Sequence, residues 1–102
     1  MFYKGMVFVG ASHNKMTAFD TKTMKSKWRF EASSTRNSAP SISAKDDIMY
    51  FGSDDGKLYA VKVDTGEKLW EFPTKGKIDS SPAIKNGVVY VSSQDGFLYA
   101  VR

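Results

Sequence analysis

Apolar residues are concentrated in short runs of four or five residues, separated by polar turn sequences. The clearest runs are Met6–Val9, Ile48–Phe51 and Val88–Val91, which are rich in β-branched and aromatic residues and in methionine. Runs of this kind, bounded by Ser, Asp, Asn and Gly, predict β-strands. No stretch keeps the 3.6-residue period of an amphipathic helix. The pattern therefore predicts an all-β fold.

Residues 57–63 are apolar at every position except Lys57 and Lys62. Side chains of a strand point alternately to opposite faces of the sheet. The two faces of this strand carry, respectively, Leu58 and Ala60, and Tyr59, Val61 and Val63. A half-exposed strand would have polar residues on one face. We therefore expect both faces to be covered by neighbouring sheets.

One unit of about 40 residues occurs more than twice in the chain. Residues 48–62 and 88–102 are identical at eight of fifteen positions, at an offset of 40 residues. The identical pairs are Tyr50/Tyr90, Ser53/Ser93, Asp55/Asp95, Gly56/Gly96, Leu58/Leu98, Tyr59/Tyr99, Ala60/Ala100 and Val61/Val101. A more diverged copy at residues 10–42 matches residues 52–84 at nine of 33 positions. We set the repeats of a single segment, 1–102, at about 5–47, 48–87 and 88–102.

Tight turns are predicted between the strands of each repeat. Asp55-Gly56 and Asp95-Gly96 suit hairpin turns, because glycine accepts a positive φ and aspartate caps its own backbone. His13, the one histidine of the chain, falls at the equivalent place in the first copy. We interpret it as a turn residue, with a catalytic base or a metal ligand as the alternative.

Four short strands in each repeat of about 40 residues predict the blade of a β-propeller. A plain antiparallel sandwich or a solenoid is the alternative, but it gives no reason for the internal identity. Grouped into blades, the predicted strands number three, four and three, starting at the second strand of the first blade. The sequence thus predicts an incomplete propeller of about two and a half repeats.

The unit at residues 50–70 resembles the repeat of the PQQ-like, or quinoprotein-type, propeller family. The resemblance rests on Tyr50, Gly52, Asp55-Gly56, Leu58-Tyr59-Ala60, Asp64-Thr65-Gly66-Glu67-Lys68 and Leu69-Trp70. It extends from about Gly5 to Arg102 and implies the propeller fold. Because the family includes both quinoprotein dehydrogenases and BamB-like envelope proteins, it implies no single activity. It does imply a place in the periplasm or cell envelope.

Ala60, Gly66 and Trp70 resemble the tryptophan-docking motif of that family. The resemblance implies that the tryptophan ring packs between blades, against the alanine and the glycine-containing turn of adjacent repeats. The equivalent positions in the other copies are Ala18, Trp28 and Ala100. Met24 stands where the motif has glycine, so we expect that turn to depart from the family's geometry.

Composition and charge exclude several classes of binding site and partner. The chain has no cysteine, which excludes disulfides, Cys-ligated zinc and iron–sulfur clusters. The apolar runs are too short for a membrane-spanning helix, so no membrane insertion is expected.

The formal charge of +4 divides into +5 for residues 1–36 and −1 for residues 37–102. One interpretation of this asymmetry is a surface that binds nucleic acid or an anionic membrane. We favour a solubilising face and expect no nucleic-acid binding, because a dedicated site usually adds exposed aromatics or a known motif, and neither is found.

Basic residues crowd one turn and the outermost strand of the first blade. They are Lys22, Lys25, Lys27 and Arg29. One interpretation is a binding patch for an acidic partner. The one we favour is that these charges keep an exposed edge strand from pairing with other sheets.

No catalytic, cofactor-binding or metal-binding residue is predicted. The adjacent carboxylates Asp46-Asp47 and Asp54-Asp55 border turns, so we interpret them as turn residues rather than as Ca²⁺ ligands or an acid–base pair. Alcohol-oxidising members of the resembling family also use adjacent cysteines, a Ca²⁺ site and a catalytic aspartate. PQQ and Ca²⁺ would therefore require a complete propeller.

An incomplete propeller leaves two blade faces uncovered. Rings close with four to eight blades, and each large apolar side chain left in water forgoes about 1.5–3 kcal/mol. We therefore expect a protein partner, either other propeller blades or copies of this chain in a homo-oligomer. The function that follows is a non-catalytic scaffold or protein-interaction segment. The alternative is a fragment of a PQQ-dependent dehydrogenase whose cofactor site lies in further blades.

Overall fold

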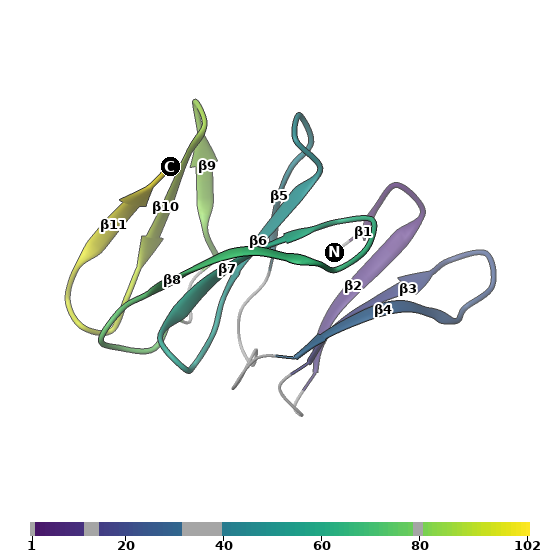
Figure 1. The fold of residues 1–102 in the computed structure, drawn as a ribbon, viewed down its shortest axis with the longest axis horizontal. Helices are drawn as coiled ribbons and strands as arrows, with labels where there is room; N and C mark the ends of the chain where they lie inside the picture. The colour runs from purple at the N-terminus through teal and green to yellow at the C-terminus, as the bar shows by residue number, and fades with distance from the viewer. Residues whose placement is uncertain (1, 12–14, 32–39, 79–80) are drawn as a thin grey trace.

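The computed structural model describes residues 2–11, 15–31, 40–78 and 81–102. In this part of the chain every regular element is a strand, and the strands form three antiparallel sheets (Figure 1). The first sheet contains β1 (Phe2–Tyr3), β2 (Met6–Ala11), β3 (Lys15–Asp20) and β4 (Ser26–Glu31). The second contains β5 (Ser41–Ser43), β6 (Ile48–Gly52), β7 (Lys57–Lys62) and β8 (Lys68–Pro73). The third contains β9 (Ala83–Lys85), β10 (Val88–Ser92) and β11 (Leu98–Val101).

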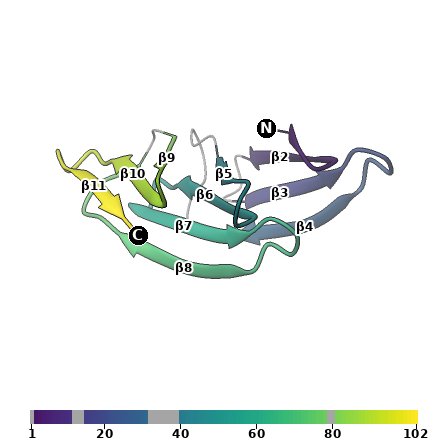
Figure 2. The same cartoon turned by 90° about the horizontal axis from the view of Figure 1, so that it is seen from above.

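Within each sheet the spatial order of the strands follows the chain. Short turns join antiparallel neighbours directly, so each sheet is a meander of hairpins. The three sheets lie next to one another, as Figure 2 shows, with the first strands β5 and β9 along one side and the last strands β4 and β8 along the other. Ser41 of β5 donates a hydrogen bond to the carbonyl of Pro82, just before β9.

The first sheet has four strands, not the three that the sequence predicted. The additional strand, β1, pairs with β2 through Phe2↔Val7 and Tyr3↔Met6. The two residues between these strands have φ angles of 50° and 76°, which allow a tight hairpin. A strand of two residues is too short to show alternation, and this is why the pattern did not reveal it. The described residues therefore contain eleven strands rather than about ten.

The sheets and the sequence repeats are offset by one strand. β5 and β9 lie at the ends of the repeats 5–47 and 48–87, but β5 pairs with β6 and β9 pairs with β10. Each repeat therefore contributes its last strand to the sheet that follows. This arrangement ties consecutive sheets together through the chain itself.

Two apolar cores hold the three sheets together. The first contains Met6, Phe8, Met16 and Ala18 of the first sheet and Met49, Phe51, Tyr59, Val61 and Val63 of the second sheet and its β7–β8 turn. The second contains Tyr50, Leu58 and Ala60 of the second sheet, Val89 and Val91 of the third, and Ile78 of the connecting loop. The prediction that both faces of residues 57–63 are covered is confirmed.

A β-bulge precedes the tryptophan in each of the first two sheets. Ala18 pairs with Trp28 and Phe19 with Ser26, so Lys27 is an additional residue in β4. The same irregularity occurs in the second sheet, where Leu69 lies between the paired residues Lys68 and Trp70. A bulge bends the strand and increases its twist. Both outer strands therefore bend at the same place, next to the tryptophan.

Two sheet faces remain open. The third sheet exposes Leu98 (71%), Tyr90 (37%) and Ala100 on the side away from the second sheet. The first sheet exposes Phe2 (67%), Val9 (43%) and Phe19 (36%). We call these two surfaces the third-sheet open face and the first-sheet open face.

Candidate blade-docking sites

Trp28 lies at the interface between the first and second sheets. Its indole N–H donates a hydrogen bond to the carbonyl oxygen of Val63, 2.7 Å away. The ring covers Gly66, which has a φ of 75° in the turn between β7 and β8. A Cβ on Gly66 would lie 2.4 Å from Cε3 of Trp28, far inside van der Waals contact. Only glycine at this position leaves room for the ring.

Trp28 also contacts residues of its own sheet. Ala18, which is fully buried, is its ladder partner in β3. Phe8 of β2 contacts the ring with a centroid distance of 5.8 Å. A small residue at position 18 thus keeps the tryptophan close to the sheet while the ring reaches across to the next one.

Trp70 has the equivalent position in the second sheet. It pairs with the buried Ala60 and contacts Tyr50 at a centroid distance of 5.7 Å. It is half-buried and packs against the second core. Ala100 lies at the corresponding place in β11 and is exposed on the third-sheet open face.

The turn that contains Met24 keeps the geometry of the turn that contains Gly66, contrary to our expectation. Met24 has a φ of 60°, and its N–H donates to the carbonyl of Asp20 at 2.8 Å, as that of Gly66 does to Lys62. The hydrogen bonds that close the two turns, Asp20 to Lys25 and Lys62 to Glu67, are both 2.9 Å long. The backbone hydrogen bonds that enclose residue 24 determine its conformation, so methionine adopts a left-handed conformation that glycine usually occupies.

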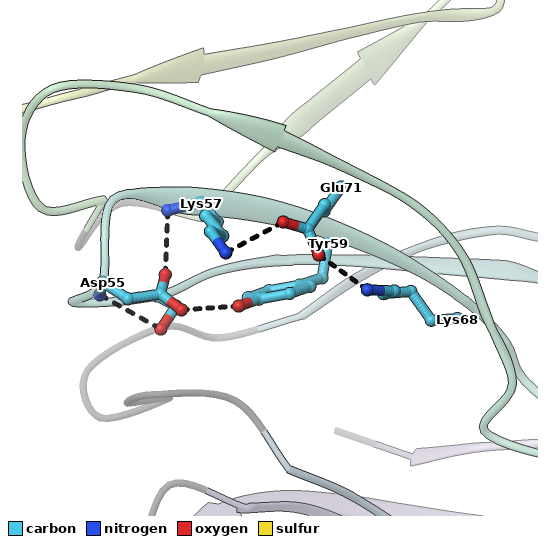
Figure 3. Close-up of polar contacts among 6 residues, drawn as sticks. Asp55, Lys57, Tyr59, Lys68 and Glu71 are labelled. Carbon is cyan, nitrogen blue, oxygen red and sulfur yellow. Dashed lines mark hydrogen bonds and ion pairs between the residues drawn. The ribbon is translucent and has the colours of Figure 1, made fainter.

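A hydrogen-bonded aspartate–tyrosine pair organises two of the predicted turns. Asp55 accepts the backbone N–H of Lys57 at 2.9 Å on one oxygen and the hydroxyl of Tyr59 at 2.5 Å on the other (Figure 3). In the third sheet, Asp95 accepts the N–H of Phe97 at 3.0 Å and the hydroxyl of Tyr99 at 2.5 Å. The adjoining glycines, Gly56 and Gly96, have φ angles of 88° and 93°.

The tyrosine hydroxyls of these pairs were not identified from the sequence, which suggested only core packing for their rings. The signal was present in the spacing, because each aspartate precedes its tyrosine by four residues in both copies. In the first copy Thr17 stands at the tyrosine position. A threonine side chain is too short to bridge the same distance.

The pKa values of Asp95 and Tyr99 are shifted in opposite directions. The hydrogen bond from Tyr99 lowers the pKa of the Asp95 carboxyl, and the backbone N–H groups of Phe97 and Lys75 lower it further. The same bond raises the pKa of Tyr99. Burial, and then the hydrogen bond to Asp55, raises the pKa of Tyr59. The Asp95–Tyr99 bond is therefore strongest when the carboxylate is charged and the phenol is neutral.

Glu71 of β8 lies between two lysines, as Figure 3 shows. Its carboxylate accepts Lys68 at 2.6 Å and Lys57 of β7 at 2.9 Å. These hydrogen bonds lower the pKa of Glu71 and raise that of Lys57. Partly exposed ion pairs of this kind contribute little to stability. Their effect is to fix the orientation of three long side chains on one face.

A second polar cluster joins the first and second sheets. Asp47 accepts the hydroxyl of Tyr3 at 2.6 Å and the ammonium group of Lys4 at 2.9 Å. These two donors lower the pKa of the Asp47 carboxyl. Asp46 accepts the hydroxyl of Ser43 at 3.3 Å within the same turn. The Ser43–Asp46 bond lies within the turn, whereas the Asp47 contacts reach the first sheet.

The basic residues of the first sheet lie at its outer edge. Lys22 and Lys25 are in the turn after β3, and Lys27 and Arg29 are on β4, all of them exposed. The carboxylate of Asp20 accepts the backbone N–H groups of Lys22 and Thr23, which lower its pKa.

Nothing in the described part of the chain forms an enclosed pocket. The same residues contain no group of three or more His, Cys, Asp or Glu side chains that could hold a metal ion. No helix among them is long and apolar enough to cross a membrane. His13 lies outside the described residues.

Stacked antiparallel sheets with hairpin-joined strands, repeated about every 40 residues, define a β-propeller repeat protein. The family model described as "Outer membrane protein assembly factor BamB" matches residues 1–102, and the chain belongs to this family of PQQ-like propeller repeats. The all-β propeller prediction and the family resemblance are thereby confirmed.

Two relatives and one solved structure show the breadth of the similarity. The quinohemoprotein alcohol dehydrogenase of Comamonas testosteroni is 32% identical over 85 residues, 81% of this chain and 12% of that protein. BamB of Yersinia pestis is 26% identical over 105 residues, 94% of this chain and 27% of that protein. The crystal structure of BamB from Moraxella catarrhalis has a TM-score of 0.81 at 18% identity, over 97% of this chain and 34% of that one. The chain spans about a quarter or less of these two relatives.

Proposed function

We propose that this chain is a non-catalytic scaffold segment of a cell-envelope β-propeller, and that its two open sheet faces bind further propeller blades. The observation that supports this most directly is that exposed residues of the outer sheets occupy the same repeat positions as residues buried between sheets. Tyr90, Leu98 and Ala100 on the third-sheet open face are the counterparts of Tyr50, Leu58 and Ala60, which are buried in the second core.

The first-sheet open face has the same relation to the first core. At an offset of 42 residues, Val9 and Phe19 correspond to Phe51 and Val61, both fully buried against the first sheet. Burying a large apolar side chain is worth about 1.5–3 kcal/mol. Two faces of this composition favour association with sheets of the same kind, from other blades or from copies of this chain.

Solution mass measured by light scattering, over a range of protein concentrations, tests the proposal. We expect the wild-type mass to rise above the 11.4 kDa of one chain as concentration increases. Leu98→Asp should suppress that rise, because it places a charge on the third-sheet open face at its most exposed apolar side chain. Leu69→Asp is the matched control, since Leu69 is also exposed (39%) but lies on β8.

A wild-type mass that stays at one chain throughout, in a folded protein, would contradict the proposal. So would equal effects of the two aspartate substitutions. Both results would mean that the open faces do not bind sheets.

The alternative is a fragment of a PQQ-dependent dehydrogenase, and the similarity to a quinohemoprotein alcohol dehydrogenase favours it. Titration with PQQ, with and without Ca²⁺, separates the two functions by tryptophan fluorescence. The scaffold proposal predicts no saturable quenching. Saturable, Ca²⁺-dependent binding would establish a cofactor site and overturn it.

A further inference from the structure

We propose that the first-sheet open face is covered by a blade that carries no tryptophan at the docking position, because Met24 occupies the space that the ring would need. This inference rests on the proposed function, since it specifies the partner of one of the two open faces. It follows from comparing two turns that share one backbone geometry and differ in a side chain.

The turn that contains Gly66 shows what docking requires. The indole of Trp28 lies against the glycine and donates to the carbonyl of Val63, three residues earlier. The position of a Cβ on that glycine is only 2.4 Å and 2.5 Å from two atoms of the ring. Backbone geometry determines where a Cβ lies, so no side-chain rotation could relieve this overlap.

The first sheet has a turn with the same backbone geometry, on which the tryptophan of a preceding blade would dock. Met24 has a φ of 60° where Gly66 has 75°, and the backbone hydrogen bonds around the two residues correspond one to one. The N–H of Thr21 donates to Gly5 at 3.0 Å, and that of its counterpart, Val63, donates to Asp47 at 3.1 Å. The carbonyl that would accept an indole N–H is therefore in the equivalent place.

The difference is the side chain of Met24, which is 78% exposed. By analogy with the turn that contains Gly66, its Cβ lies where the six-membered part of a docked indole would be. A blade with a smaller or aliphatic residue would leave a space for the methionine to fill, and methionine adapts well to irregular spaces. The neighbouring surface, with Val9 and Phe19, is apolar and suits such a sheet.

A tandem variant tests this prediction directly. A copy of residues 1–40, which contains one tryptophan, is fused ahead of the full chain so that the added repeat can pack on the first-sheet open face. Its tryptophan, the copy of Trp28, is either kept or replaced by leucine. Each form is then made with Met24, Met24→Gly or Met24→Asn in the original chain. Urea unfolding, together with tryptophan fluorescence, measures how stably the added repeat docks.

With Met24 retained, we expect the leucine form to dock more stably than the tryptophan form, by about tenfold in the docking equilibrium constant. Met24→Gly should reverse that order. Met24→Asn is the control for backbone strain, because asparagine tolerates a left-handed φ but keeps a Cβ. It should preserve the preference for leucine.

A tryptophan form that docks more stably than the leucine form beside Met24 would overturn the inference. An unchanged order after Met24→Gly would do the same. An added repeat that docks in none of the six variants would instead contradict the proposed function, because the open face would then not bind a blade.

Discussion

At the Trp28 site, the identity of residue 66 is limited by how closely the indole ring approaches the backbone. Gly66 accepts a positive φ and also leaves room for a ring at a distance that no Cβ would permit. The two requirements are separable, because other glycines of this chain have a positive φ and open space where a Cβ would lie. The contribution of the ring contact can therefore be measured.

Replacement of Gly66 by alanine is predicted to lower the free energy of unfolding by about 2–5 kcal/mol, combining left-handed strain with an overpacked ring. Gly87→Ala is the matched control, since Gly87 has a φ of 77° and no atom within 4 Å of the position that a Cβ would take. That change should cost only the strain, about 1–2 kcal/mol. Urea unfolding of both variants is the measurement. Equal losses would mean that the ring yields to the methyl group.

Met24 is predicted to be a site of stored backbone strain. Glycine there should stabilise the isolated chain by about 0.5–1 kcal/mol, because relief of left-handed strain exceeds the added entropy of the unfolded chain. The side chain is mostly exposed, so little packing is lost. Met24→Ala, which keeps a Cβ, should show no such gain. Thermal unfolding midpoints of the two variants decide the point, and an equal shift would refute it.

At the level of elements, the aspartate of each of two hairpin turns is hydrogen-bonded to a tyrosine four residues later, on the strand that follows the turn. The tyrosine ring packs in a core while its hydroxyl holds the carboxylate that caps the turn. The hairpin and the sheet interface are therefore coupled through one side chain.

The Asp95–Tyr99 bond is predicted to make stability depend on pH at both extremes. The folded-state pKa of Asp95 is lowered, so its contribution is present above the unfolded pKa, about 3.9, and is lost as pH falls through the folded value. The folded-state pKa of Tyr99 is raised. Its contribution is therefore complete below pH of about 10 and is lost as pH rises through the folded value.

Comparison of the wild type with Tyr99→Phe measures this contribution. The difference between their urea midpoints should be constant between about pH 5 and 9 and should shrink toward both ends. Tyr90→Phe is the control, because Tyr90 is an exposed tyrosine on the third-sheet open face. A Tyr99→Phe difference that does not change below about pH 4 would show that the carboxylate is not involved.

In the whole molecule, the three sheets form a linear stack in which each core joins only two neighbours. Proteins of this kind derive their stability from repeats and nearest-neighbour interfaces. The second sheet contributes to both cores, and the outer sheets to one each.

Local stability should therefore respond to the nearer core. Phe51→Ala, in the first core, should cost about 3–5 kcal/mol and reduce hydrogen-exchange protection most in β2 and β3. Val91→Ala, in the second core, should reduce it most in β10 and β11. Hydrogen exchange followed by mass spectrometry distinguishes these patterns. Uniform loss of protection across all three sheets in both variants would mean that the stack unfolds as a single unit.

The sequence alone determined the all-β class, the repeat, the faces of β7 and the positions of the tight turns. These features depend on alternation and on glycine or aspartate at turns, which are local properties. The repeated alanine and tryptophan positions were also visible, because a residue that recurs in each repeat serves the repeat.

Only the tertiary structure decided which residues meet across sheets. β1 has two residues and no periodicity, so its pairing with β2 had to be observed. Trp28 reaches Val63 and Gly66 over 35 residues or more of sequence, a distance at which no spacing rule applies. The turn at Met24 keeps its form because its hydrogen bonds outweigh the preference of a single residue. Contacts between sheets depend on how the sheets stack, and local pattern carries no information about that.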